Sequence, residues 1–311
     1  MLGLLWAACV VLVPFPIVRE SQLPLSGKRV LVAAPRAVAA PLAAALIAAG
    51  ARPLWSQVVV TEPLDEASLG QLDDALLRLT EYDLLLLLSR DAVDAVVQRG
   101  LLLSDSSEDV LRLMLRASGV ELAALGPAAL HLSATLGLAA GAVPVDPTPD
   151  GLAAVLSALG TVRAGSRVLV PTARMRAPLC DSPVVRACIE RLRADGCEVE
   201  LVEAYGQRVA KADELQVERN LLLHEAGTVD AVCLCSALDA QGLALVLGAE
   251  AEAAAAPPPF VASVTDEAAE EAARTLVWRA GLVVAAGSPA SEAEALVEGL
   301  EVHFGAGKLL F

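Results

Sequence analysis

The chain has 311 residues and a formal net charge of −15 at pH 7, and 56% of its residues are hydrophobic although only 3% are aromatic. A negative field of this size repels nucleic acid and anionic lipid, so neither is expected as a partner. The length is sufficient for two domains of ordinary size, whose cores must be built from Ala, Leu and Val.

The N-terminal segment stands apart from the rest. Met1 to Val18 carries no charged side chain, and Pro14 and Pro16 interrupt its second half. A secretory signal has a basic region before its apolar stretch, which this segment lacks. We interpret residues 1–25 as a targeting or disordered extension or a misassigned start, with a membrane anchor as the alternative. No later span is free of charge over the length that crosses a bilayer. We therefore expect soluble domains without stable membrane association, in a plastid for a photosynthetic eukaryote and otherwise in the cytoplasm.

From Gly27 onward, short aliphatic segments alternate with Ala- and Leu-rich amphipathic segments, which is typical of parallel sheets covered by helices on both faces. The strand predicted at 27–32 recurs at 165–170 as Gly-x-Arg-Val-Leu-Val. A second predicted strand ends at Ser89 in the first half and at Ser236 in the second. These repeats predict an α/β fold of two doubly wound parallel-sheet domains that arose by internal duplication.

Each half also contains an extended segment after its first predicted strand and helix, over 54–62 and 198–209. We expect these segments to pair as a two-stranded antiparallel hinge. Domain one then combines 26–53 with 210–311, and domain two spans 63–197. Because only the hinge need connect them, we expect the domains to touch little and to move relative to one another. A monomer is expected.

Motifs for cofactors and metals are not found. The six cysteines show no Cys-x-x-Cys spacing, and the three histidines lie far apart without acidic companions at ligand spacing. We expect reduced core thiols and no metal site. The sequence also lacks a GxGxxG or phosphate-binding loop motif, and no cofactor is expected.

An ordered set of short motifs resembles the uroporphyrinogen-III synthase family over about residues 26–300. In chain order the motifs are Gly27-Lys-Arg-Val-Leu-Val, Ala49-Gly50-Ala51, Tyr82-Asp83, Ser89-Arg90-Asp91-Ala92-Val93, Leu125-Gly126-Pro127, Asp150-Gly151-Leu152, Arg167-Val168-Leu169-Val170-Pro171 and Gly196-Cys197-Glu198-Val199 through Tyr205. The resemblance implies a cofactor-free lyase of haem and chlorophyll biosynthesis. Such an enzyme closes the small-molecule substrate hydroxymethylbilane, a linear tetrapyrrole, with loss of water and inversion of its terminal pyrrole ring.

The sequence departs from the family pattern at three turns, one of which is the turn of the second half, where Ser263-Val264-Thr265 stands. The family's first strand ends in Thr-Arg-Pro, whereas Ala33-Ala34-Pro35 stands here. A Gly-Pro-x-Thr turn of the family is replaced by Gly126 to Ala129, which removes a hydroxyl. These departures concern individual substrate contacts, at Ala34 and Ala129, and bear on whether activity is reduced.

The implied substrate is a polycarboxylate, and strand-to-helix turns offer free N–H groups and the positive ends of helix dipoles. Candidate substrate-binding residues follow the predicted strand ends: Ser89, Arg90, Gly126, Thr148, Thr172, Arg174, Ser236, Ala237, Ser263 and Thr265. Ser and Thr at these places also fit helix N-caps. Arg90 either clamps a carboxylate or is simply solvated.

Tyr205, on the second hinge segment, is the candidate catalytic residue. The matching tyrosine of the family is thought to assist departure of the substrate's hydroxyl, and a phenol can donate a hydrogen bond to that oxygen at neutral pH. Packing at the hinge is the alternative role for Tyr205. Tyr82 precedes a predicted strand, and we interpret it as structural.

Two rival functions remain open. A two-domain ligand-binding protein of periplasmic type is also an α/β duplication with hinge segments. An inactive paralogue of the synthase is suggested by Ala34 and Ala129. Incubation with hydroxymethylbilane separates both from an active enzyme.

Overall fold

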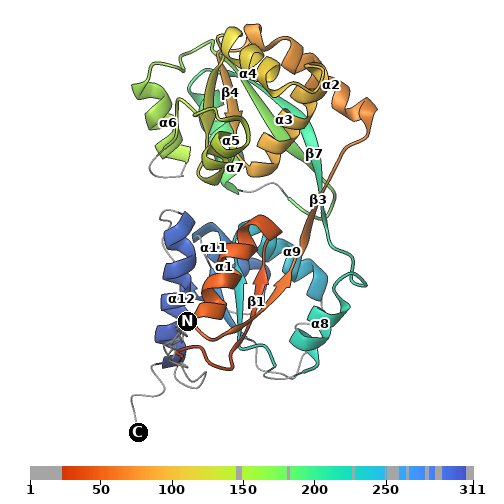
Figure 1. The fold of residues 1–311 in the computed structure, drawn as a ribbon, viewed down its shortest axis with the longest axis vertical. Helices are drawn as coiled ribbons and strands as arrows, with labels where there is room; N and C mark the ends of the chain where they lie inside the picture. Colours follow the sequence, from red (N-terminus) through yellow and green to blue (C-terminus); the bar gives the residue numbers. More distant parts are fainter. Residues whose placement is uncertain are drawn as a thin grey trace, which may run out of the picture.

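Two five-stranded sheets, one above the other in Figure 1, organise the chain. The computed structural model describes residues 23–144, 149–180, 183–225, 228–248, 250, 259–263, 266–276, 280–283 and 289–305. We call the lower lobe the part built on the sheet β10-β9-β8-β1-β2, and the upper lobe the part built on β3-β7-β6-β4-β5. The fold is α/β with parallel sheets, as predicted.

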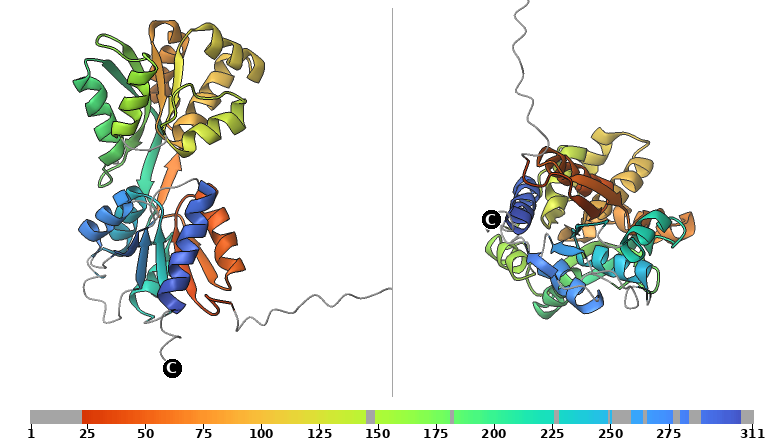
Figure 2. Two further views of the ribbon diagram at one scale, coloured as in Figure 1. Left: turned by 90° about the vertical axis from the view of Figure 1, so that its left-hand side faces the viewer. Right: turned by 90° about the horizontal axis from the view of Figure 1, so that it is seen from below.

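In the lower lobe, all strand pairs are parallel. Its strands are β1 (Arg29–Ala33), β2 (Arg52–Ser56), β8 (Ala231–Leu234), β9 (Phe260–Ser263) and β10 (Ala280–Val283). Its helices are α1 (Arg36–Ala48), α8 (Gln216–Leu223), α9 (Ala237–Leu247), α11 (Asp266–Thr275) and α12 (Pro289–Gly305). One apolar cluster joins α1 and α12 to the sheet, and a second joins α8, α9 and α11 to it, so helices cover both faces (Figure 2).

The upper lobe has four parallel strands and one antiparallel strand, β3. Its strands are β3 (Val59–Glu62), β4 (Leu84–Leu87), β5 (Glu121–Ala124), β6 (Arg167–Met175) and β7 (Glu198–Val209). Its helices are α2 (Glu66–Leu77), α3 (Arg90–Leu103), α4 (Glu108–Ala117), α5 (Pro127–Leu136), α6 (Pro149–Ala158) and α7 (Pro183–Ala194), with a 3-10 turn η2 (Leu79–Glu81).

The leucine run of β4 shows why both faces of the upper sheet are covered. Leu84 and Leu86 pack in the cluster with α6 and α7, whereas Leu85 and Leu87 pack in the cluster with α2 to α5. Successive side chains of a strand point to opposite faces, so an unbroken aliphatic run must be buried on both sides. All four side chains are accordingly buried.

Equivalent aspartates hold the amino ends of the two sheets in the same way. Asp83 accepts a 2.8 Å hydrogen bond from the backbone N–H of Arg167, and Asp230 accepts one of 2.8 Å from the N–H of Arg29. In each case the aspartate lies just before a strand of one half, β4 or β8, and its side chain binds the backbone of the first strand of the other half. Each lobe thus combines segments from both halves of the duplication.

The hinge segments have different extents from those expected. Residues 54–56 belong to β2, which pairs in parallel with β1, and only Val59–Glu62 pairs antiparallel with the end of β7. Most of β7 pairs in parallel with β6 inside the upper sheet. Alternating apolar and polar side chains indicate a strand but do not identify the strand with which it pairs. The boundaries that we expected for the two hinge segments were displaced for this reason.

The predicted N-terminal extension also ends earlier than residue 25. Leu25 is fully buried in the lower-lobe cluster with α1 and α12, and its N–H donates to the carbonyl of Ala49 at 3.0 Å. Residues 1–22 lie outside the described part of the chain. Within the described part, no helix has the length and apolar character required to cross a bilayer.

The loop between β6 and α7 makes a contact between the lobes that we did not expect. Leu179 is buried in the lower-lobe cluster with α8 and α9. The N–H of Cys180 donates to the side chain of Gln241 on α9 at 3.2 Å. Within the upper lobe, the guanidinium of Arg176 lies 2.8 Å from Glu62 on β3. This loop therefore joins the lobes in addition to the hinge strands.

Candidate active site

The carboxyl ends of the parallel strands in both sheets meet at the junction between the lobes. β2 leads upward into β3, and β7 leads downward into α8 of the lower lobe (Figure 1). The other parallel strands run with β2 or with β7. The strand-to-helix turns of each lobe therefore face the other lobe, where ligands of α/β proteins commonly bind.

Ser89 and Tyr205, two of the residues predicted for the site, are in contact. The Oγ of Ser89 lies 2.8 Å from the hydroxyl of Tyr205. Ser89 is the N-cap of α3 and accepts a 3.0 Å hydrogen bond from the N–H of Ala92, so the structure also confirms its capping role. Tyr205 is 8% exposed and packs with the upper-lobe core, which fixes the ring.

Asp91, which we had not chosen as a site residue, lies two positions after Ser89. Its Oδ2 accepts hydrogen bonds from Thr61 Oγ1 at 2.9 Å and from Gln207 Nε2 at 3.2 Å. Burial raises the pKa of the Asp91 carboxyl, and these two hydrogen bonds lower it in part. No local pattern of the sequence indicates this contact, because it depends on the register of β3 against β7.

One turn further along α3, Asp94 contacts His131 of α5. The Nε2 of His131 lies 2.6 Å from Asp94 Oδ1, and both side chains are partly exposed. The negative charge of Asp94 contributes to raising the pKa of Asp91, whereas His131 lowers it. The amino end of α3 thus carries a row of polar groups, of which Ser89 and Arg90 were predicted.

Arg90 and Ser263 each have a buried polar atom with no hydrogen-bond partner among the described residues. In Arg90, at the first position of α3, that atom is Nε. In Ser263, at the end of β9, it is the hydroxyl, and this side chain is fully buried. Arg90 is partly exposed and is therefore accessible to an anion, whereas Ser263 is covered in this conformation.

Ser236 repeats the capping role of Ser89 in the lower lobe. It is the N-cap of α9 and accepts a 3.2 Å hydrogen bond from the N–H of Asp239. Its hydroxyl donates to Asp239 Oδ2 at 2.7 Å. Burial raises the pKa of Asp239 to about 7. Ala237, the first residue of α9, is buried. A serine therefore caps the equivalent helix in both halves. Its hydroxyl also contacts Tyr205 in the upper lobe and Asp239 in the lower lobe.

Thr172 and Arg174 are occupied by neighbouring groups of the upper lobe. The hydroxyl of Thr172 donates to the carbonyl of Val202 at 3.4 Å. Arg174 Nε lies 2.6 Å from Glu203, and its Nη1 lies 3.0 Å from Ser68 Oγ. The charge of Arg174 is already paired, so it is a weaker candidate for a carboxylate clamp than Arg90.

The remaining predicted residues are backbone turns or lie outside the described chain. Gly126 is the N-cap of α5 with φ +50°, a conformation that glycine adopts without strain. The backbone of Ala34 is engaged, since its N–H donates to Ser56 and its carbonyl accepts from the Trp55 indole. Thr148 and Thr265 lie outside the described residues.

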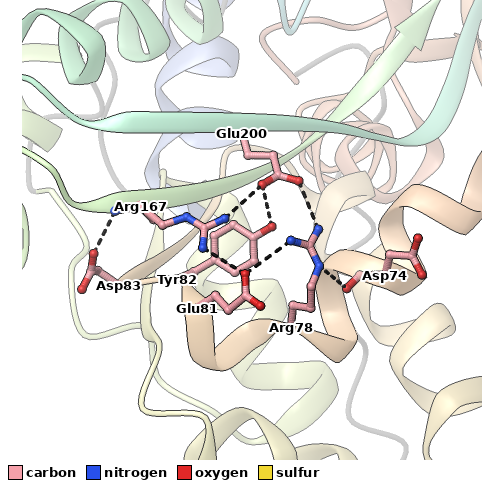
Figure 3. A network of polar contacts seen from close by, with 7 residues as sticks. All are labelled: Asp74, Arg78, Glu81, Tyr82, Asp83, Arg167 and Glu200. Carbon is pink, nitrogen blue, oxygen red and sulfur yellow. Dashed lines mark hydrogen bonds and ion pairs between the residues drawn. The ribbon is translucent and has the colours of Figure 1, made fainter.

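A second polar cluster lies at the opposite, amino end of the upper sheet (Figure 3). The hydroxyl of Tyr82 donates to Glu200 at 2.7 Å, and the Arg167 guanidinium lies 5.0 Å from the ring centroid. Burial and the Glu200 carboxylate raise the pKa of Tyr82 to about 12. Arg78 and Arg167 both contact Glu81, so charges of both signs are paired. This arrangement fits the structural role predicted for Tyr82.

Comparison with known proteins agrees with this architecture. Residues 40–303 match the model of the family described as uroporphyrinogen-III synthase HemD. The chain belongs to the uroporphyrinogen-III synthase family. A crystal structure of a mutant uroporphyrinogen III synthase from Thermus thermophilus is 22% identical, with 88% of this chain and 99% of that chain covered and a TM-score of 0.55. A wild-type crystal form from the same bacterium is 20% identical, with 91% and 99% coverage and a TM-score of 0.44.

No curated protein matches the chain by sequence. The first of the two crystal structures shows that this chain has the fold of a uroporphyrinogen III synthase. The family match extends over both lobes and includes Ser89, Arg90, Tyr205 and Ser236, whereas β1 precedes it. The turns at the junction of the lobes therefore belong to the part of the chain that the family shares.

Proposed function

We propose that this chain is a uroporphyrinogen-III synthase, which converts hydroxymethylbilane into the ring of uroporphyrinogen III with loss of water and inversion of the terminal pyrrole. The observation that carries the proposal is the hydrogen-bonded pair of Ser89 and Tyr205 at the lobe junction in a member of this family. A buried phenol held by a helix cap is a suitable donor for a leaving hydroxyl group.

In the proposed reaction, Tyr205 donates a hydrogen bond to the departing hydroxyl of the substrate and passes its proton to it, so that water leaves. Ser89 holds the phenol oxygen in place through the hydrogen bond between the two hydroxyls. The cation that remains is stabilised by the pyrrole nitrogen. The proton that the terminal pyrrole releases when the ring closes restores the phenol. The protein therefore needs to supply one positioned donor rather than a strong acid.

Ring closure then depends on how the bound chain is folded. Attack on the cation by the substituted carbon of the terminal pyrrole gives a spiro intermediate, whose fragmentation and reclosure invert that ring. The free neighbouring position of the same pyrrole gives the non-inverted type I product. Holding the correct carbon at the cation is an effect of proximity and orientation, which two facing lobes are suited to provide.

The carboxylates of the substrate need local donors, because the net charge of the chain is −15. The amino ends of α3, α5 and α9 face the junction and offer N–H groups and positive dipole ends. Arg90 adds a guanidinium whose Nε is buried without a partner among the described residues. A bidentate contact with a carboxylate would satisfy it.

The decisive experiment is incubation of the purified chain with hydroxymethylbilane, followed by oxidation and chromatographic separation of type III and type I uroporphyrin. We expect type III to dominate. A ligand-binding protein or an inactive paralogue would leave the spontaneous type I product unchanged. Exclusive formation of type I at all enzyme concentrations would overturn the proposal.

A further inference from the structure

The amino end of α3 contacts β7 through two polar pairs with identical spacing. Ser89 reaches Tyr205, and Asp91 reaches Gln207, so each pair joins residues that are 116 positions apart. Residues two apart on a strand point to the same side of the sheet, which aligns Tyr205 and Gln207. The first turn of α3 is thus held on β7 at two successive points.

Asp91 extends this contact to the second hinge strand. Thr61 on β3 and Gln207 on β7 are direct partners in the antiparallel ladder. Both side chains donate to the same oxygen of Asp91, at 2.9 and 3.2 Å. One carboxylate oxygen therefore bridges the two hinge strands and the helix that carries Ser89.

We propose that Asp91 is a positioning residue for Tyr205. It seats the first turn of α3 on the hinge ladder and thereby keeps the Ser89 hydroxyl within hydrogen-bond distance of the Tyr205 hydroxyl. This inference rests on the proposed function, since Asp91 affects that reaction only through Tyr205. The carboxylate itself is committed to Thr61 and Gln207 and is not assigned to the substrate.

A role restricted to helix stability would have different consequences. Asp91 lies in the first turn of α3, where any negative charge is favourable. Loss of that effect would lower stability and leave the surroundings of Tyr205 unchanged. A positioning role instead requires that removal of Asp91 alters the environment of Tyr205, more than removal of another carboxylate on the same helix does.

The first test is ¹⁹F NMR on protein containing 3-fluorotyrosine. The chain has only two tyrosines, so the two signals are assigned with Tyr82→Phe and Tyr205→Phe. We expect Asp91→Ala to shift or broaden the Tyr205 signal and to leave the Tyr82 signal in place. Asp94→Ala is the matched control, because Asp94 lies one turn further along α3 and contacts His131 rather than the hinge strands.

The second test is a double-mutant cycle on kcat for conversion of hydroxymethylbilane. Asp91→Ala alone is expected to lower kcat about ten- to a hundredfold with little change in KM, as for a small misplacement of a catalytic group. In the Tyr205→Phe background the same change is expected to cost less than about threefold, because coupled residues are not additive. Asp91→Asn retains an acceptor oxygen and is expected to restore most of the rate.

Two outcomes overturn the inference: an unmoved Tyr205 signal in folded Asp91→Ala, or equal losses from Asp91→Ala with and without Tyr205. If Asp91→Ala does not fold, Thr61→Val removes one of the two donors and must still move the Tyr205 signal. An inactive wild-type chain would refute the proposed function. The NMR result would then still decide whether Asp91 positions Tyr205, so the two failures are distinguishable.

Discussion

The hydroxyls of Ser89 and Tyr205 lie 2.8 Å apart, and they join the N-cap of α3 to a strand from the other half of the duplication. Ser89 already caps α3, and the Tyr205 ring is already held by the upper-lobe core. The hydrogen bond between the two hydroxyls is therefore additional to the contacts that hold each residue in place. Their contact is therefore the feature of the junction that most directly suggests chemistry.

Replacement of Tyr205 by Phe is expected to slow formation of the type III ring by about ten- to a thousandfold, as for the loss of one positioned donor. The ring and its packing are retained, so the stability cost should be on the order of 1 kcal/mol. Chromatography of type III and type I products gives the rate, and thermal melting gives the control. A variant that melts normally and turns over at the wild-type rate would leave Tyr205 with a packing role.

Tyr82→Phe is the matched control for that substitution. It removes the 2.7 Å hydrogen bond to Glu200 at the opposite end of the upper sheet. Because a charged, partly buried carboxylate loses a donor, we expect a stability loss of about 1–3 kcal/mol. Turnover per folded molecule should be unchanged. A large loss of turnover in this variant would show that tyrosine removal acts indirectly in both places.

Ser89→Ala and Ser107→Ala separate capping from chemistry. Each serine is an N-cap, Ser89 of α3 and Ser107 of α4, and each replacement should cost about 1 kcal/mol in unfolding free energy. Only Ser89 contacts Tyr205, so only Ser89→Ala should also lower kcat. Denaturant unfolding and turnover assays on both variants check this. Equal kcat in the two variants would mean that Ser89 contributes its cap and nothing more.

The parallel sheets and the duplication were predictable, because aliphatic runs, amphipathic helices and repeated segments are local patterns. Ser89 and Ser236 were likewise marked by their places at strand ends. The pairing of Asp91 with Thr61 and Gln207 was not predictable, because it depends on the register of β3 against β7. Register follows from three-dimensional packing, and the alternating sequence of a hinge segment is compatible with several registers.

The same reasoning explains the errors at the boundaries. Residues 52–56 are extended whether they belong to a hinge segment or to the lower sheet. They belong to the lower sheet because they pair with β1, and this pairing is not visible in their own sequence. Leu25 was assigned to the extension because an apolar segment precedes it, although its side chain fills the lower-lobe core. The contact of the β6–α7 loop with α9 through Leu179 and Gln241 has no counterpart in any local pattern.

Gly242 on α9 marks a close approach between that helix and the link from β2 to β3. A Cβ there would lie 2.8 Å from Val59 Cγ2 and 3.2 Å from the carbonyl of Val58. Gly242→Ala should therefore cost about 1–3 kcal/mol, as overpacking does. Gly70 on α2 has open space around it, and Gly70→Ala should stabilise by up to about 1 kcal/mol. If both variants shift the unfolding midpoint upward, α9 does not pack on the hinge as described.

Asp239 should make the stability of the protein depend on pH. Its folded pKa is raised to about 7 by complete burial, so the folded state holds this proton more tightly than the unfolded state does. The contribution to stability is fully present below the unfolded pKa of about 4 and is lost as pH rises to about 7. Each unit of pKa difference corresponds to about 1.4 kcal/mol.

The test of this dependence is the difference in unfolding free energy between Asp239→Asn and the wild type, measured with denaturant at pH 5 and pH 8. The amide still accepts the hydrogen bond from Ser236 but does not ionise, so the difference should move in favour of the variant by about 1–4 kcal/mol at the higher pH. All other titrating groups are common to both proteins and cancel in the comparison. Asp213→Asn, at an exposed position, is the control for the change from aspartate to asparagine itself. A difference for Asp239→Asn that is the same at both pH values would mean that Asp239 is ionised in the folded protein at pH 5, with its charge held by the amino end of α9.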